Sequence, residues 1–222
     1  MAEGPGAKDR RRLVANAAPL AAAIGVFGVS YGVLARSAGI PGWLVVTMSA
    51  LVFAGSSQFA VASLLAAGAS APAILLSASL LNLRYLATGA SAAPSLGGPR
   101  WRRLLAAQLV IDESYALGVA AGPPGKPDRH TMVIGGALMW MAWVLGSSAG
   151  VLVGPVIGDP ARFGLDAAFP AGFVALLWPM LASRPALRAA IAGAVVALAL
   201  APFTPAGVPL AGAAAVGLLL SR

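Results

Sequence analysis

The sequence predicts an all-α, polytopic integral membrane protein with about seven to eight transmembrane segments. The chain of 222 residues is 59% hydrophobic and only 10% charged, whereas soluble domains carry roughly 25% charged residues. Four runs also lack Asp, Glu, Lys and Arg, and each is long enough for one or two helices of about 20 residues: 13–35, 37–83, 131–158 and 189–221. The alternation of polar and apolar residues that is typical of a membrane barrel is missing.

The basic N-terminal stretch predicts a cytoplasmic tail before the first helix. Residues 1–12 end in Lys8, Arg10, Arg11 and Arg12 and are expected to form a cytoplasmic tail, with residues 13–222 forming one transmembrane domain. A cleaved signal peptide is the alternative, but the apolar run is long and no clear small-residue cleavage site follows it. The net charge of +8 does not indicate nucleic-acid binding, because the basic residues lie at helix ends and in short loops.

Apolar runs and turn signals divide the domain into segments. Helices are expected at 13–35, 43–67, 73–93, 104–121, 131–157 and 167–182, and a hairpin of two short helices at 189–220. The hairpin prediction rests on the prolines at 202, 205 and 209, since proline disrupts a helix interior.

The distribution of basic residues favours a cytoplasmic N-terminus but leaves the middle helices open. With every segment crossing, nine basic residues lie inside and five outside, in line with the positive-inside rule. The cluster Arg100, Arg102 and Arg103 then lies outside. Making 43–67 a re-entrant hairpin moves this cluster inside, but it gains nothing overall, because it moves Lys126, Arg129, Arg184 and Arg188 outside.

Segment 53–59 places polar residues in the middle of an expected span. Gly55, Ser56, Ser57 and Gln58 lie between Phe53 and Phe59. One interpretation is a discontinuous or re-entrant helix, because transporters use the positive end of a half-helix to hold an anionic group such as a carboxylate. The other is an unbroken helix whose small residues permit close packing.

A polar stripe follows the next expected helix. Ser77, Arg84, Thr88 and Ser91 share one helical face, and Asn82, Tyr85 and Gly89 form an adjacent stripe. Such a face is expected to meet protein or water rather than lipid. Arg84 lies near the middle of its span and needs a carboxylate or carbonyl partner. It would either bind substrate or form a structural ion pair.

Two adjacent acids occupy the following expected helix. Asp112 shares a face with Gln108 and Tyr115, and Glu113 lies about 100° around the helix. Two neighbouring carboxylates at low dielectric are rarely ionised together. One can pair with Arg84 while the other takes up and releases a proton. In the alternative, the helix begins later and both acids lie at the membrane interface.

Small residues recur every four positions at Gly146, Gly150, Gly154 and Gly158, with Ala142 in phase, and Gly28 and Gly32 repeat the spacing. This pattern predicts close helix contact, either within the chain or with a partner subunit. Trp140, Trp143 and Trp178 are interpreted as packing or interface residues.

The sequence offers no set of residues for metal binding or catalysis. His130, the only histidine, is expected in a solvated loop, and the chain has no cysteine. We therefore expect no metal site, cofactor or catalytic residues.

Three segments together resemble the AzlC family: 53–59, 81–85 followed by 89–94, and 112–117. The resemblance runs from about Ala18 to the C-terminus. It implies a multi-pass permease of the bacterial cytoplasmic membrane, a small AzlD-like membrane partner, and export of branched-chain or related amino acids. Tyr85 departs from the family pattern, in which a histidine commonly follows the arginine, so any proton relay through that histidine must differ here.

These observations predict a proton-coupled amino-acid exporter. The residues expected to bind substrate are Phe53, Gly55, Ser56, Ser57, Gln58, Phe59, Asn82 and Arg84. Those expected to couple protons are Asp112, Glu113 and Tyr115. The alternatives are a channel-like or uncoupled permease for other small solutes, or a membrane scaffold that does not transport.

Overall fold

The described part of the chain is built from helices. The computed structural model describes residues 7–157, 178–204 and 208–220, together with Gly164 and Val174. Within these ranges every regular element is a helix, which confirms the predicted all-α membrane class. The elements are α1 (Ala7–Ser37), α2 (Gly42–Leu51), α3 (Gly55–Ala66), α4 (Ala71–Asn82), α5 (Arg84–Leu96), α6 (Arg100–Ala107), α7 (Asp112–Ala121), α8 (Arg129–Ile157), the 3-10 helix η2 (Trp178–Ala182), α10 (Arg184–Leu200) and α11 (Val208–Leu220).

Fewer of these helices have spanning length than the sequence suggested. In the described ranges three stretches are long and apolar enough to cross a membrane: Leu13–Ser37, Ala71–Leu96 and Arg129–Val156. A fourth is added only if α6 and α7 count together as one span. The difference arises because the segments expected at 43–67 and 104–121 are each broken into two short helices. The segment expected at 167–182 lies largely outside the described residues.

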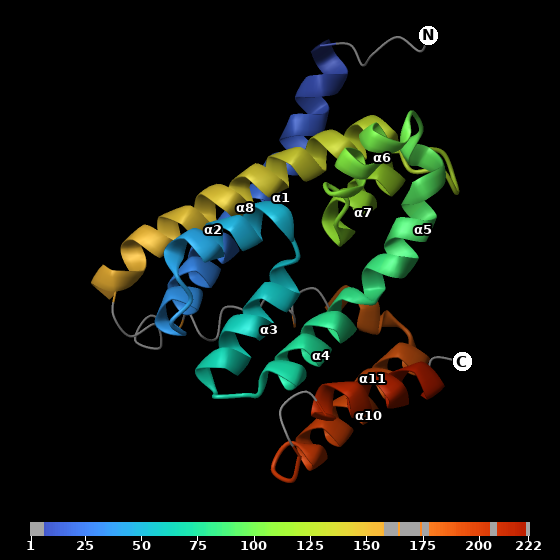
Figure 1. The fold of residues 1–222 in the computed structure, drawn as a ribbon. Coiled ribbons are helices and arrows are strands. Elements are labelled where there is room, and N and C mark those ends of the chain that lie inside the picture. Colours follow the sequence, from blue (N-terminus) through green and yellow to red (C-terminus); the bar gives the residue numbers. More distant parts are fainter. Residues whose placement is uncertain (1–6, 158–163, 165–173, 175–177, 205–207, 221–222) are drawn as a thin grey trace.

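Helices α1 and α8 lie side by side over much of their lengths (Figure 1). Glycines bring the two backbones together: a Cβ on Gly28 would lie 3.1 Å from the backbone nitrogen of Ser147, and one on Gly32 would overlap the carbonyl oxygen of Ser147. The contacts advance together along both helices, so α1 and α8 are parallel. The predicted glycine ridge therefore packs within the chain; its last member, Gly158, lies outside the described residues.

The segment α2–α3 is a hairpin beside this pair. Gly42, at the start of α2, lies against the Val151 side chain, and the carbonyl of Ala50, near the end of α2, accepts a 2.9 Å hydrogen bond from Trp140 Nε1. Helix α2 therefore runs antiparallel to α8, and α3 turns back toward the end from which α2 started (Figure 1). The discontinuous form of this segment is confirmed.

Helices α4 and α5 together cross the molecule. Only Leu83, which keeps helical dihedrals, separates them. The far end of α5 meets the start of α8, where Arg129 Nε donates a 2.9 Å hydrogen bond to the Leu96 carbonyl. The start of α1, with its lysine and three arginines, lies at the same end. We therefore call this the basic end of the molecule.

The segment α6–α7 is a second hairpin, which enters from the basic end. The two helices are bent by 109°, so the prediction of one helix over 104–121 was wrong. Extended dihedrals at Ile111 interrupt it (φ −120°, ψ 171°). The Leu109 carbonyl packs against Gly136 of α8, whereas Gly122, just beyond α7, packs against Lys126 near the start of α8. Helix α7 therefore returns to the basic end.

Two hairpins that enter from opposite ends change the predicted distribution of charge. The arginines at 100, 102 and 103, Lys126 and Arg129 now share the basic end with Lys8–Arg12 of α1. A single re-entrant segment could not achieve this. Of the predicted tail, residues 1–6 lie outside the described residues, and 7–12 form the first turns of α1.

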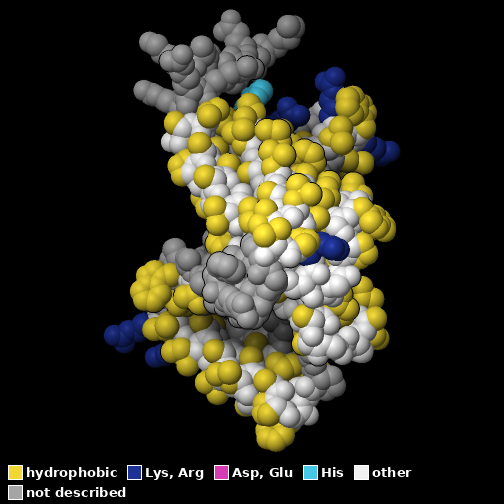
Figure 2. All heavy atoms as spheres, turned by 90° about the vertical axis from the view of Figure 1, so that its left-hand side faces the viewer, with side chains coloured by type: hydrophobic (Ala, Val, Ile, Leu, Met, Phe, Trp, Pro, Cys, Tyr) yellow, Lys and Arg dark blue, Asp and Glu magenta, His cyan; other side chains and the backbone are white. Residues whose placement is uncertain are grey.

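The last described helices form the predicted hairpin. Helices α10 and α11 pack against each other, and α11 also contacts α4. Residues 205–207 of their connection lie outside the described residues. Seen from the left-hand side of Figure 1, the described surface is dominated by hydrophobic side chains, and few Lys and Arg side chains interrupt it (Figure 2). Such a surface suits lipid.

Candidate functional site

Arg84 connects the tips of the two hairpins. It lies in the middle of the α4–α5 crossing, where its Nη1 is 2.9 Å from Asp112 Oδ2 and its Nη2 donates a 2.9 Å hydrogen bond to Ser56 Oγ. Ser56 belongs to the first turn of α3, and Asp112 is the first residue of α7. One guanidinium group therefore contacts both half-helices.

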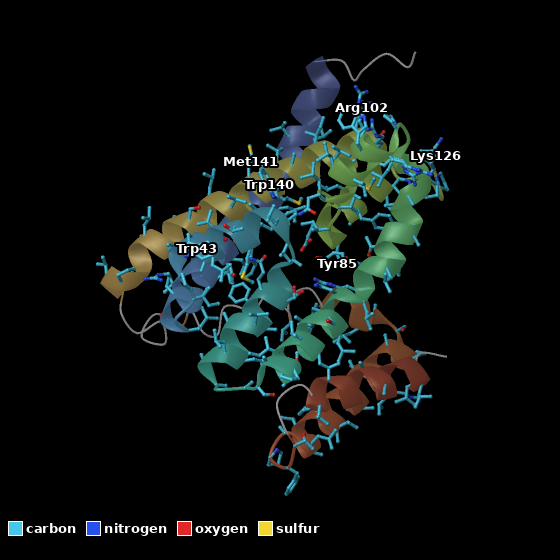
Figure 3. The ribbon with its side chains drawn as sticks, viewed as in Figure 1. Trp43, Tyr85, Arg102, Lys126, Trp140 and Met141 are labelled. Carbon is cyan, nitrogen blue, oxygen red and sulfur yellow. The ribbon has the colours of Figure 1, made fainter. Side chains whose placement is uncertain are left out.

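Two further side chains complete this polar centre. Thr88, one turn along from Arg84 on α5, donates a 3.3 Å hydrogen bond to Asp112 Oδ1. The Arg84 guanidinium also lies over the Tyr85 ring, 5.1 Å from its centroid, in a cation–π contact. Figure 3 shows Tyr85 in the space between α3, α5 and the α6–α7 hairpin.

The position of Asp112 has an electrostatic reason. The first turn of a helix carries a partial positive charge that stabilises an anion, and Asp112 and Glu113 both lie in the first turn of α7. Helix α7 begins at Asp112, later than the helix expected from residue 104, as the alternative prediction held. The acids lie at the inner tip of a hairpin rather than at the membrane surface, because Asp112 reaches the mid-span Arg84.

The α2–α3 break is held by a buried amide. Gln58 Oε1 accepts hydrogen bonds from the Ala54 backbone nitrogen (3.3 Å) and from Trp143 Nε1 (3.1 Å), and Gln58 Nε2 lies 3.4 Å from Ser49 Oγ. The Gln58 residue is only 1% exposed. Phe53 at this break has a φ of 43°, in the left-handed region that a bulky residue rarely adopts.

An aromatic cluster packs beneath this break. The Trp143 ring stacks on Tyr31 with centroids 5.5 Å apart, and Phe59 meets both rings edge-on. Gly55 packs closely under the same ring, because a Cβ there would lie 3.1 Å from the Trp143 ring and would require it to shift. These contacts fix the start of α3 against α1 and α8.

The α6–α7 break is held by a hydroxyl group. Ser114 Oγ accepts a 2.9 Å hydrogen bond from the Ile111 backbone nitrogen and lies 3.0 Å from the Leu109 carbonyl, to which it donates. The turn also touches the other hairpin, since Gln108 Nε2 donates a 2.7 Å hydrogen bond to the Leu51 carbonyl at the end of α2.

The polar centre is not filled by the described protein. The side chains of Arg84 and Asp112 remain 38% and 40% exposed, although Arg84 lies in the middle of a spanning stretch. Charged groups at that depth rarely face lipid and instead face a cavity, a ligand or another protein. The ion pair is therefore not enclosed by the described residues around it.

Most of the predicted site residues fall into two groups. Ser56, Arg84 and Asp112 meet in the polar centre, with Glu113 next to Asp112 but in no ion pair with a described residue. Phe53, Ser57, Gln58 and Phe59 are buried around the first break. Asn82 Oδ1 is buried without a hydrogen-bond partner, and Tyr115 packs against a separate cluster of Ala92, Leu96, Ala106 and Met132.

Sequence reasoning assigned no site role to Thr88, Gln108 or Trp143. Thr88 did appear in the predicted polar stripe, so its helical spacing from Arg84 was a usable signal. Gln108 bonds to the Leu51 carbonyl, and Trp143 bonds to Gln58, which is far away in the sequence. Neither contact produces a local sequence pattern. His130, expected in a loop, lies exposed in the first turn of α8.

Comparison with known proteins finds one family model and several membrane proteins that are similar to this chain. The family model described as AzlC protein matches residues 19–157. The branched-chain amino acid transport protein AzlC of Bacillus subtilis is 26% identical over 162 residues, covering 71% of this chain and 62% of the relative's length. An uncharacterized membrane protein of Archaeoglobus fulgidus is 33% identical over 199 residues, covering 86% of this chain and 84% of that protein.

A further relative and the structural search complete the comparison. An uncharacterized membrane protein of Haemophilus influenzae is 30% identical over 145 residues, which cover 63% of this chain and 58% of the relative. No solved structure matches the chain. The family match contains all three motifs noted in the sequence and every residue of the polar centre. On these grounds the chain is a membrane protein that belongs to the AzlC family.

Proposed function

We propose that this chain is a permease that exports branched-chain or related amino acids across the bacterial cytoplasmic membrane. Its family and the branched-chain amino acid transport protein of Bacillus subtilis to which it is similar support an amino-acid substrate. The observation that carries the proposal is the half-exposed Arg84–Asp112 pair in the middle of a crossing. An AzlD-like small membrane subunit is the proposed partner.

The polar centre has the contacts that an amino acid needs. The Arg84 guanidinium and the positive end of α3 suit a carboxylate, and Asp112 or Glu113 suits an ammonium group. Tyr85 and the apolar residues around it supply a surface for an aliphatic side chain. Phe53, Gln58 and Phe59 act behind this surface: they hold α3 in place rather than touch substrate.

Transport follows from competition at Arg84. A substrate carboxylate that binds Arg84 displaces Asp112, and the released Asp112 then accepts the ammonium group or a proton. Glu113 offers a second carboxylate in the same turn, so one acid can bind while the other carries the proton. Because the two hairpins enter from opposite ends, movement of either tip away from Arg84 opens the centre toward one side only.

A counterflow assay with purified protein in liposomes tests this proposal. Labelled leucine is expected to exchange in a saturable, pH-dependent manner, and the small subunit is tested by adding and omitting it. Asp112→Asn and Glu113→Gln are each expected to abolish proton-driven leucine movement while the protein still inserts. Asp128→Asn is the matched control, because Asp128 caps α8 at the basic end (2.7 Å to the Thr131 backbone nitrogen).

Three results would contradict the proposal. Flux without saturation or pH dependence indicates a channel or an uncoupled permease. Absence of any leucine movement, with an intact fold and the small subunit present, indicates a non-transporting scaffold. Normal proton-driven leucine movement in both acid variants removes these acids from the coupling step.

A further inference from the structure

A groove lies between α5 and α6, away from the polar centre. Its volume is about 300 Å³, at the lower end of the range for ligand pockets. The walls are apolar and the mouth is basic: Gly89, Ala93, Leu96 and Leu104 line it together with Arg100 and Arg103. Nothing lies within 4 Å of the position that a Cβ on Gly89 would occupy, so the deep part of the groove is open.

The arginines of α6 have no acidic partner among the described residues, where the ion pair present is Arg84–Asp112. Arg102 lies over the Trp101 ring, 5.0 Å from its centroid, and does not line the groove. Arg100 and Arg103 do line it. Two unpaired guanidinium groups above an apolar groove are complementary to an anionic head on an apolar chain.

Helix α6 has the features of a helix in the membrane interface. Its sequence begins with three arginines and a tryptophan within four residues, and two of its large apolar side chains that do not line the groove are exposed: Trp101 by 57% and Leu105 by 64%. Tryptophan and arginine favour the headgroup level. The mouth of the groove therefore lies at headgroup depth, and Gly89, earlier on the α5 crossing, lies deeper.

We propose that this groove binds an anionic phospholipid at the basic end of the protein. Arg100 and Arg103 hold the headgroup phosphate, and one acyl chain lies along Ala93 toward Gly89. The proposal is independent of the transported substrate. The bound lipid would contact α6, the first helix of the hairpin that carries Asp112.

Lipid titration of the full-length protein in detergent tests the proposal. Native mass spectrometry and thermal unfolding are followed while phosphatidylglycerol or phosphatidylcholine is added. Phosphatidylglycerol is expected to bind and raise the unfolding temperature, whereas phosphatidylcholine and glycerol phosphate without acyl chains are not. The double variant Arg100→Gln/Arg103→Gln is expected to bind roughly 30-fold more weakly, the factor for two arginines at an anionic lipid surface.

Matched variants separate binding from folding. Arg102→Gln removes the same charge outside the groove and is expected to bind nearly as the natural protein does. Gly89→Leu fills the deep groove and is expected to abolish binding, whereas Gly217→Leu, at another open helix position, is not. Every variant is first checked for a single elution peak in size exclusion.

Several results would overturn the proposal. They are equal stabilisation by the two lipids, binding unaffected by Arg100→Gln/Arg103→Gln, and an equal loss with Arg102→Gln. Loss of the bound lipid when a small membrane subunit or a second copy associates would also overturn it, because the groove would then be a protein interface.

Discussion

The two hairpins are built on the same plan but stabilised differently. In each, a side chain from the first turn of the second helix accepts a hydrogen bond from a backbone nitrogen at the break: Gln58 from Ala54, and Ser114 from Ile111. The α2–α3 break is packed against aromatic rings, whereas the α6–α7 break, although Ser114 is fully buried, carries two acids and an exposed Gln108. We infer that the α2–α3 break is rigid, whereas the α6–α7 break moves when the charge of Asp112 or Glu113 or of their partners changes.

Two glutamines give the sharpest test of this contrast in stability. Gln58→Leu leaves the Trp143 indole and the Ala54 nitrogen without their buried acceptor, so the free energy of unfolding is expected to fall by about 2–4 kcal/mol. Gln108→Leu makes the same substitution at the exposed hydrogen bond between the two hairpins and is expected to cost about 1 kcal/mol or less. Thermal unfolding in one detergent measures both. Equal losses would contradict the inference.

Among Arg84→Gln, Gln108→Leu and Thr88→Val, Arg84→Gln is expected to slow leucine exchange the most. It removes the group that joins both hairpin tips and leaves Asp112 unpaired. Because both side chains are partly exposed, we expect the activation free energy of exchange to rise by roughly 2–3 kcal/mol, which makes leucine exchange about 30- to 160-fold slower. Arg102→Gln is the control, with exchange unchanged.

A charge swap distinguishes the two roles of Arg84. Exchange rescued by Arg84→Asp combined with Asp112→Arg indicates a structural pair. Failure of the swap, in protein that still folds, supports contact between Arg84 and substrate.

Gln108→Leu is expected to change transport moderately. It removes the hydrogen bond that ties the α6–α7 tip to the Leu51 carbonyl, and a bond of this kind contributes about 1 kcal/mol. Leucine exchange should change by roughly five-fold, measured beside Gln108→Glu as a variant of similar size. An effect as large as that of Arg84→Gln would mean that Gln108 contacts substrate itself.

Thr88→Val is expected to have the smallest effect. It removes the 3.3 Å hydrogen bond to Asp112 while keeping the shape of the side chain. The exchange rate should fall by about two- to three-fold, in line with roughly 0.5 kcal/mol for a long bond. Thr47→Val is a control, since the Thr47 hydroxyl bonds only to its own helix. A loss above ten-fold would give Thr88 a direct role.

The sequence predicted the helical membrane class and the polar partners of the centre, and it offered a break at 53–59 as one of two interpretations. These features depend on local composition, on helical spacing and on the cost of charge at membrane depth. It did not predict the break at 108–111, because Leu109, Val110 and Ile111 read as ordinary helix. The sequence also did not predict that the two hairpins enter from opposite ends of the molecule. The directions of the hairpins depend on contacts such as Gly136 with Leu109, between residues far apart in the sequence.

The most direct test of the account uses the absence of cysteine in the chain. Single variants Ser37→Cys and Ser70→Cys flank the α2–α3 hairpin, and Arg102→Cys and Lys126→Cys lie at the two outer ends of the α6–α7 hairpin. With a membrane-impermeant maleimide, the first two are expected to react from one side of the membrane and the last two from the other. Reaction of Ser37→Cys and Ser70→Cys from opposite sides would contradict the account, because α2–α3 would then cross the membrane.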